Sequence, residues 1–243
     1  MAPIAQRLIT VADAAHVARL AAENLAHTLV DRLRSGKRAA IALSGGNTPR
    51  DAYVALARAP GIDWSRVDVF WVDERAVPPT DDRSNYRWAK ATLIDGARID
   101  PARVHRMPAD QSDLEAAARA YEAEIRAGVA TGPGGVPSFD AIVLGVGDDG
   151  HTASLFPGAS TVDVQDRWVI AVPALGAREA RLTITRPVIQ HAAHVFVLVV
   201  GSAKRDALER AWSPEGDLHA TPSRLIAGCH GDVTWIVDEA AAR

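Results

Sequence analysis

The residues best suited to acid–base chemistry lie in residues 139–157, where an apolar run ends abruptly in glycines. Such a run is typical of a buried strand, and the glycines are typical of a tight turn at its carboxyl end. His151 follows in this turn, two residues after Asp149. An imidazole can accept or donate a proton near neutral pH, and a carboxylate can orient it and stabilise its charged form. The competing interpretation is a loop histidine that is hydrogen-bonded only to backbone.

A second glycine turn, residues 44–49, joins a predicted strand to a predicted helix. Gly45 and Gly46 let the backbone approach a ligand closely, and the free N–H groups at the helix start favour an anion. Side-chain donors are added by Ser44, Asn47 and Thr48. The segment predicts either a phosphate-binding loop or an ordinary turn with Thr48 as the N-cap. It is not a Walker A loop, because no Gly-Lys-Ser/Thr follows.

Three basic residues accompany other predicted strand ends. Arg75 follows the strand 67–72, and Arg181 opens a later strand. Lys204 falls in the first turn of a predicted helix, where a lysine is unfavourable for the helix dipole, so an anion is expected near it. An arginine can hold a phosphate or polarise a carbonyl, although a solvated charge cluster would also explain Arg75.

The glycine spacing of residues 145–150 matches G-x-G-x-x-G, but a dinucleotide site is not favoured. Pro157 interrupts any helix soon after the last glycine, and the next strand, 168–172, lacks an acidic residue to hold a ribose. The acidic pair 148–149 would also repel a pyrophosphate. These carboxylates and His151 could bind a divalent ion, but nothing requires one, and we predict no metal site.

The alternation of strand and helix patterns predicts the framework that positions these residues. Strands are expected at 37–43, 67–72, 139–144, 168–172, 181–185, 194–200 and 233–237; helices are expected at 11–33, 49–57, 84–94, 113–126, 187–191, 203–211 and 222–227. This order predicts an α/β fold with a mainly parallel sheet and helices on both faces. Ligands bind at the carboxyl ends of such strands, so the segments above should meet at one edge. The Gly/Pro-rich stretch 131–137 reads as a surface loop within one domain, residues 1–243.

Composition sets the broad class of protein. The chain has 243 residues, 48% of them hydrophobic, and a net charge of −3 without a long basic tract, which argues against nucleic-acid or membrane-surface partners. Cys229 is the only cysteine, so no intrachain disulfide can form, and a buried structural thiol is expected. Residues 1–10 do not resemble a signal peptide, and no apolar stretch approaches the roughly 20 residues of a spanning helix. We expect a cytoplasmic protein that binds a small molecule.

Taken together, these segments resemble the 6-phosphogluconolactonase family. The resemblance covers residues 43–208 and comprises six motifs in the family's order: Leu-Ser-Gly-Gly-Asn-Thr-Pro (43–49), Trp-Val-Asp-Glu-Arg (71–75), Ser-Asn-Tyr (84–86), Leu-Gly-Val-Gly-Asp-Asp-Gly-His-Thr-Ala-Ser-Leu-Phe-Pro (144–157), Arg-Leu-Thr-Ile-Thr (181–185) and Gly-Ser-Ala-Lys (201–204). One such motif would be a weak signal, whereas six in order are highly specific.

The resemblance implies a Rossmann-like α/β fold and a monomeric hydrolase. Its reaction would open 6-phospho-D-glucono-1,5-lactone to 6-phospho-D-gluconate in the oxidative pentose phosphate pathway, without a cofactor. It further implies that His151 is the catalytic base, assisted by Asp149, and that Arg75 contacts the substrate. Arg75 and backbone N–H groups are the candidates for stabilising the oxyanion that develops at the carbonyl. The implied substrate- and phosphate-binding residues are Ser44, Gly45, Gly46, Asn47, Thr48, Arg181 and Lys204.

Two other functions stay open at this point. The related glucosamine-6-phosphate deaminases share several of these motifs but place a catalytic glutamate five residues after the histidine, where this chain has Phe156. Phenylalanine cannot supply the additional acid–base group that an isomerising deaminase needs. A non-catalytic sugar-phosphate sensor is the other alternative, and the intact pair of His151 and Asp149 argues against it.

Overall fold

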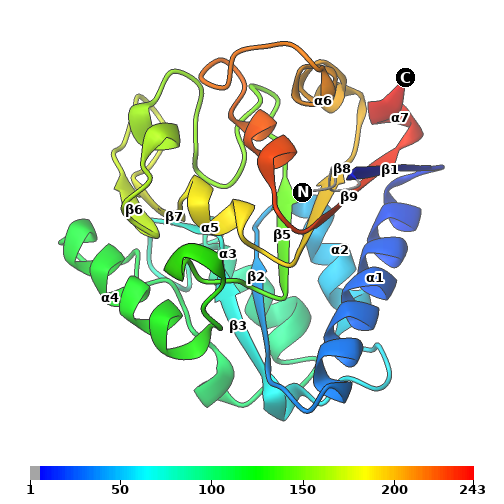
Figure 1. Ribbon diagram of the computed structural model, residues 1–243, viewed down its shortest axis with the longest axis vertical. Helices are drawn as coiled ribbons and strands as arrows, with labels where there is room; N and C mark the ends of the chain where they lie inside the picture. Colours follow the sequence, from blue (N-terminus) through cyan, green and yellow to red (C-terminus); the bar gives the residue numbers. More distant parts are fainter. Residues whose placement is uncertain (1–5) are drawn as a thin grey trace.

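The computed structural model describes residues 6–243 and has a parallel sheet at its centre (Figure 1). The six strands of this main sheet are β1 (Gln6–Val11), β2 (Ala39–Leu43), β3 (Val67–Trp71), β5 (Ala141–Gly145), β8 (His194–Val199) and β9 (Asp232–Asp238). Their spatial order is β1-β9-β8-β5-β2-β3, and every adjacent pair is parallel. Strands β2 and β3 are buried along their whole length, which explains why their residues are apolar apart from Asp68 of β3.

The longer helices cover this sheet. Helices α1 (Ala14–Arg34) and α2 (Asn47–Leu56) pack against each other, and α1 also packs against β8 and β9. Side-chain caps fix where helices begin: Asp13 accepts a hydrogen bond from the backbone N–H of His16 at the start of α1. The remaining helices are α3 (Asn85–Ala89), α4 (Leu114–Gly128), α5 (Arg186–Gln190), α6 (Arg205–Trp212) and α7 (Glu239–Ala242). Within residues 6–243, no helix is both long and apolar enough to cross a membrane.

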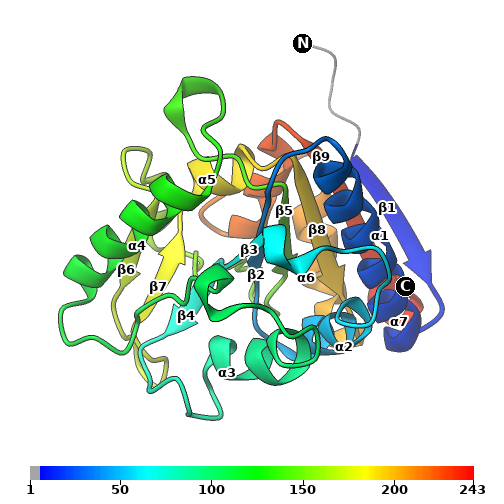
Figure 2. The same cartoon turned by 90° about the horizontal axis from the view of Figure 1, so that it is seen from below.

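A second, smaller sheet adjoins the main one. It contains β4 (Asp73–Arg75), β7 (Arg181–Ile184) and β6 (Val169–Val172), in that order and antiparallel. Val72 joins the two sheets, because its N–H donates to Leu43 of β2 while its carbonyl accepts from Ile184 of β7. Helix α4 covers β6 and β7, and Figure 2 shows this unit on one side of the molecule with α1 and β1 on the other.

The mainly parallel α/β fold confirms the prediction from sequence, with four differences in detail. The segments 168–172 and 181–185 are strands, but they pair with β4 in the separate antiparallel sheet, a partner that their own residue pattern cannot reveal. Strands β1 and β4 were not expected. Residues 222–227 belong to a 3₁₀ helix (Pro222–Gly228). Thr48 is not the N-cap of α2: Gly46 takes that position with a φ of 108°, a backbone conformation that favours glycine.

Candidate active site

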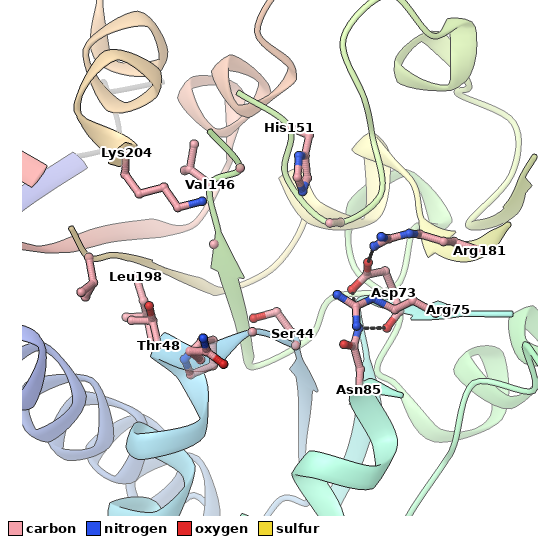
Figure 3. Close-up of a pocket in the computed structure, with 18 residues that line it drawn as sticks. Ser44, Thr48, Asp73, Arg75, Asn85, Val146, His151, Arg181, Leu198 and Lys204 are labelled. Carbon is pink, nitrogen blue, oxygen red and sulfur yellow. Dashed lines mark hydrogen bonds and ion pairs between the residues drawn. The ribbon is translucent and has the colours of Figure 1, made fainter. Parts of the chain in front are cut away.

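A pocket of about 510 Å³ opens at the carboxyl edge of β2, β5 and β8, as the topology predicts for an open parallel sheet (Figure 3). Loops after these three strands form most of its wall, and β4, β7 and the start of α3 complete it. Every site residue predicted from sequence lines this pocket except Asp149, which lies directly behind His151. Figure 3 shows His151 pointing into the pocket, with Lys204 on one side and Arg75 on the other.

The glycine loop, residues 44–48, forms the floor of the pocket. It follows β2, and its last two residues begin α2, so the first N–H groups of this helix have no partner within the helix. Tyr53, one turn into α2, holds the loop: its hydroxyl accepts from the N–H of Ser44 at 3.0 Å and donates to the carbonyl of Ser44 at 2.9 Å. The side-chain oxygen of Ser44 is buried and has no hydrogen-bond partner among residues 6–243. The loop therefore offers unused donors to an anion.

Asn85 links the glycine loop to the small sheet. Its side-chain amide donates to the carbonyl oxygen of Asp73 at 2.9 Å and to the Asp73 carboxylate at 3.0 Å. The same amide lies against Gly45, where an added Cβ atom would come within 1.7 Å of Asn85 Oδ1. Glycine is therefore required at position 45 by contact with Asn85 rather than by backbone conformation.

Asp149 orients the imidazole of His151. The carboxylate oxygen Oδ1 lies 2.6 Å from Nδ1 of the ring and also accepts from the backbone N–H of His151 at 3.0 Å. Partial burial acts to raise the pKa of Asp149, but the hydrogen bonds from His151 and its charge outweigh burial, so the pKa lies below its ordinary value. With Nδ1 engaged by Asp149, Nε2 is the ring nitrogen left for chemistry.

The loop after His151 is fixed on both sides of Ala153. The Thr152 hydroxyl donates to the carbonyl of Gly145 at 2.9 Å, and the Ser154 hydroxyl donates to the Asp73 carboxylate at 2.5 Å. Ala153, between them, has a φ of 50°, a strained conformation for a residue other than glycine. The buried side chains of Thr152 and Ser154 hold the backbone in this strained conformation from both sides, so the backbone next to the imidazole is firmly anchored.

Phe156 packs against the imidazole ring of His151. Its ring is almost completely buried, and its centroid lies 4.7 Å from that of His151. The guanidinium of Arg178 lies over the same phenyl ring at 3.6 Å, within the distance of a cation–π interaction. The position that carries a catalytic glutamate in the deaminase pattern is therefore an aromatic contact here.

The small sheet supplies the cationic wall of the pocket. Arg181 lies 3.5 Å from the Asp73 carboxylate, and burial lowers the pKa of its guanidinium, an effect that Asp73 partly offsets. Arg75 donates to the carbonyl of Arg83. The Nε atoms of both pocket arginines are buried and have no hydrogen-bond partner among residues 6–243. The Nε–H donor of each of these two side chains is thus not used by the protein itself.

Glu74 holds Arg75 in place from beneath. Its buried carboxylate accepts from the backbone N–H groups of Arg75, Asn85 and Tyr86, each at 2.8 Å, and from the hydroxyl of Ser84 at 2.9 Å. Burial raises the pKa of Glu74 although these hydrogen bonds act in the opposite direction. One carboxylate therefore joins β4 to the N-terminus of α3, close to where the dipole of a helix favours negative charge.

Lys204 lines the side of the pocket opposite Arg75 and Arg181 (Figure 3). It lies in the short 3₁₀ turn (Ser202–Lys204) that leads into α6, and its ammonium group forms an ion pair with the Asp148 carboxylate. The anion expected beside this lysine from its unfavourable helix position is thus present in the protein. Asp148 itself is largely exposed and does not line the pocket.

Two residues with polar side chains that line the pocket were missed as site residues. Asp73 and Asn85 both line the pocket and are bonded to each other. They fall in the Asp-Glu-Arg and Ser-Asn-Tyr motifs, but neither motif by itself indicates that one of its residues faces a ligand. The signal that could have found them is that both motifs follow the same strand end, β3.

Other reactive groups do not compete with this site. Burial raises the pKa of the Cys229 thiol to about 12, so it is protonated at neutral pH, and it lies outside the pocket. No group of three or more His, Cys, Asp or Glu side chains within the described residues 6–243 has the arrangement of a metal site. The pocket therefore combines cationic side chains with a single carboxylate-oriented imidazole.

Comparison with known proteins defines the family to which this α/β chain belongs. The family model "Glucosamine-6-phosphate isomerases/6-phosphogluconolactonase" matches residues 12–235. The chain is 42% identical to a 6-phosphogluconolactonase of Synechocystis over 83% of this chain and 82% of that protein, and 38% identical to one of Streptomyces coelicolor over 97% and 93%. The chain belongs to this family.

Solved structures agree with this assignment. The 6-phosphogluconolactonase from Trypanosoma cruzi superposes with a TM-score of 0.85 at 28% identity, covering 98% of this chain and 96% of that one. A monomeric glucosamine-6-phosphate deaminase superposes with a TM-score of 0.80 at 20% identity, over 97% and 98% of the two chains, which shows a common fold and nothing about activity.

Proposed function

We propose that this protein is a hydrolase that opens 6-phospho-D-glucono-1,5-lactone to 6-phospho-D-gluconate, the lactone step of the oxidative pentose phosphate pathway. One observation carries the proposal: the imidazole of His151, oriented by Asp149, points into a pocket with cationic side chains on two sides. The names of the relatives support the same substrate. The deaminase alternative is not favoured, because Phe156 occupies the position of its additional acid–base group.

His151 acts as the general base in this mechanism. Nε2 removes a proton from a water molecule as the water oxygen attacks the lactone carbonyl, and Asp149 stabilises the resulting imidazolium through Nδ1. The imidazolium then returns the proton to the ring oxygen as the C–O bond breaks. The products are a carboxylic acid, which ionises and releases a proton, and the C5 hydroxyl of the opened sugar.

The two cationic sides of the pocket bind different parts of the substrate. The glycine loop and Lys204 bind the phosphate, which supplies affinity and orientation. Arg75 donates to the carbonyl oxygen as it becomes an oxyanion, and Arg181 adds positive charge beside it. Asp73, Asn85 and Glu74 fix the positions of these two arginines before the substrate binds. Little reorganisation of the protein is therefore needed when negative charge develops on the carbonyl oxygen.

Hydrolysis of freshly prepared 6-phosphogluconolactone, followed by proton release with the unaided rate subtracted, tests the proposal. The purified protein should accelerate it, and His151→Ala should lower kcat by about 10²–10⁴-fold with a smaller change in KM. An unchanged kcat in this variant would place the base elsewhere. Release of ammonia from glucosamine 6-phosphate would support the deaminase, and binding without turnover would support a sensor.

The monomeric state, the cytoplasmic location and the lack of nucleic-acid partners belong to the same proposal. The residues to which the mechanism assigns a role all belong to this chain, so the proposed chemistry does not require a second subunit. Analytical ultracentrifugation tests this part, because a stable dimer would contradict it.

A further inference from the structure

Lys204 already forms an ion pair with a carboxylate of the protein itself. Its ammonium group lines the pocket and is paired with the carboxylate of Asp148. Asp148 is the only acidic partner of Lys204 among residues 6–243. The Asp148 side chain is 67% exposed, so the pair lies at the edge of the pocket rather than in its interior.

This geometry has a consequence for any anionic ligand. A ligand phosphate that reaches Lys204 meets a lysine whose charge is partly balanced by a carboxylate. Because the pair is largely solvated, its strength is modest, and a phosphate dianion carries more charge than a carboxylate. A ligand with a phosphate can therefore replace Asp148, whereas a neutral sugar lactone has nothing with which to replace it.

We propose that Asp148 competes with the substrate phosphate for Lys204 and thereby lowers the affinity of the pocket for phosphorylated ligands. This inference rests on the proposed function of the pocket and adds a residue that does not touch the reacting atoms. The carboxylate makes this edge of the pocket less positive. Asp148 therefore sets the affinity for the phosphate group and has no effect on the binding of the neutral sugar ring.

The alternative role for Asp148 is to hold Lys204 in the correct position. The two roles predict opposite effects of removing the carboxylate. If Asp148 competes, its loss frees Lys204 and strengthens phosphate binding. If Asp148 positions the lysine, its loss weakens phosphate binding.

The decisive variant is Asp148→Asn, which keeps the size of the side chain and removes its charge. We expect KM for 6-phosphogluconolactone to fall by about two- to fivefold with kcat unchanged, the range given by exposed ion pairs. The dissociation constant of inorganic phosphate, measured by calorimetry, should fall by a similar factor. KM for unphosphorylated glucono-1,5-lactone should not change. An unchanged or raised KM and phosphate dissociation constant would overturn the proposal.

Two controls separate competition from a general change in charge. Asp232→Asn makes the same change of charge at an exposed carboxylate at the beginning of β9, on the opposite edge of the sheet, and should leave KM unaffected. In a Lys204→Ala background, Asp148→Asn should have no effect on phosphate binding, because the two residues act through one contact. An equal effect in that background would also overturn the proposal. Phosphate binding needs no turnover, so this test stands even if the lactone proves not to be the substrate.

Discussion

The imidazole of His151 occupies the space that a Cβ atom at position 147 would need. A Cβ built on Gly147 would lie 2.0 Å from Nδ1 of His151 and 2.7 Å from the nearer carboxylate oxygen of Asp149. The backbone of Gly147 does not have the positive φ that would itself demand glycine. Position 147 is thus glycine because the catalytic pair that we propose lies against it.

Replacing Gly147 with alanine should therefore disable the site without unfolding the protein. The methyl group must displace the ring from Asp149, and we expect kcat to fall by about 10²-fold or more. Steady-state hydrolysis and thermal unfolding should be measured together. Gly145→Ala, at the end of β5 and two residues before Gly147, is a control for stability, since its Cβ would meet nothing closer than the Leu198 carbonyl at 3.9 Å. Wild-type activity in the Gly147 variant would contradict the proposed role of His151.

Tyr53→Phe should weaken substrate binding more than it slows the chemistry. The variant loses both hydrogen bonds to the backbone of Ser44, so the glycine loop is less well positioned. We expect KM to rise by about tenfold, equivalent to about 1.4 kcal/mol, with kcat nearly unchanged.

Tyr121→Phe is the matched control for this variant. Tyr121 is also fully buried and bonds the backbone of a strand residue, Trp71, but neither residue lines the pocket. Both variants should lose stability by about 1–3 kcal/mol through unsatisfied backbone groups, and only Tyr53→Phe should raise KM. A similar KM in the two variants would mean that Tyr53 is purely structural.

Lys204→Ala should mainly raise KM. We expect the proposed contact with the phosphate to be equally strong in the ground state and the transition state, so that its loss affects binding rather than the chemical step. A hydrogen bond to a charged group predicts an increase of about 10- to 100-fold. Lys37→Ala, which removes a lysine just before β2 at the opposite edge of the sheet, should behave as wild type. A fall in kcat with an unchanged KM would move Lys204 from the phosphate to the reacting centre.

Asp149 should contribute to stability only while it is ionised. Its pKa in the folded protein is below the ordinary value of 3.8, so its contribution is complete above about pH 5 and is lost as the pH falls through the folded-state value. The side chain is half exposed, and solvent screening keeps the contribution below about 1 kcal/mol. Urea unfolding should show a difference between wild type and Asp149→Asn that shrinks as the pH falls from 5 towards 3. A difference that grows over this acid range would contradict this sign.

The sequence was sufficient to predict the loops of the site because their chemistry is local. The glycines of residues 44–48, and His151 two residues after Asp149, are visible as patterns at strand ends. The small sheet was not predicted, because the pairing of β7 with β4 joins segments more than 100 residues apart. For the same reason Asp73 and Asn85 were not expected in the pocket: their role depends on contacts with Gly45, Ser154 and Arg181.

The short strands of the small sheet set a limit on heat tolerance. Strands β4, β6 and β7 contain only three or four residues each, yet β4 and β7 carry both arginines of the pocket. Warming should therefore loosen this edge and stop turnover before the six-stranded core melts. For a durable biocatalyst, new cross-links belong between the segments on either side of the Arg83–Glu179 ion pair, rather than in a core that is already closely packed.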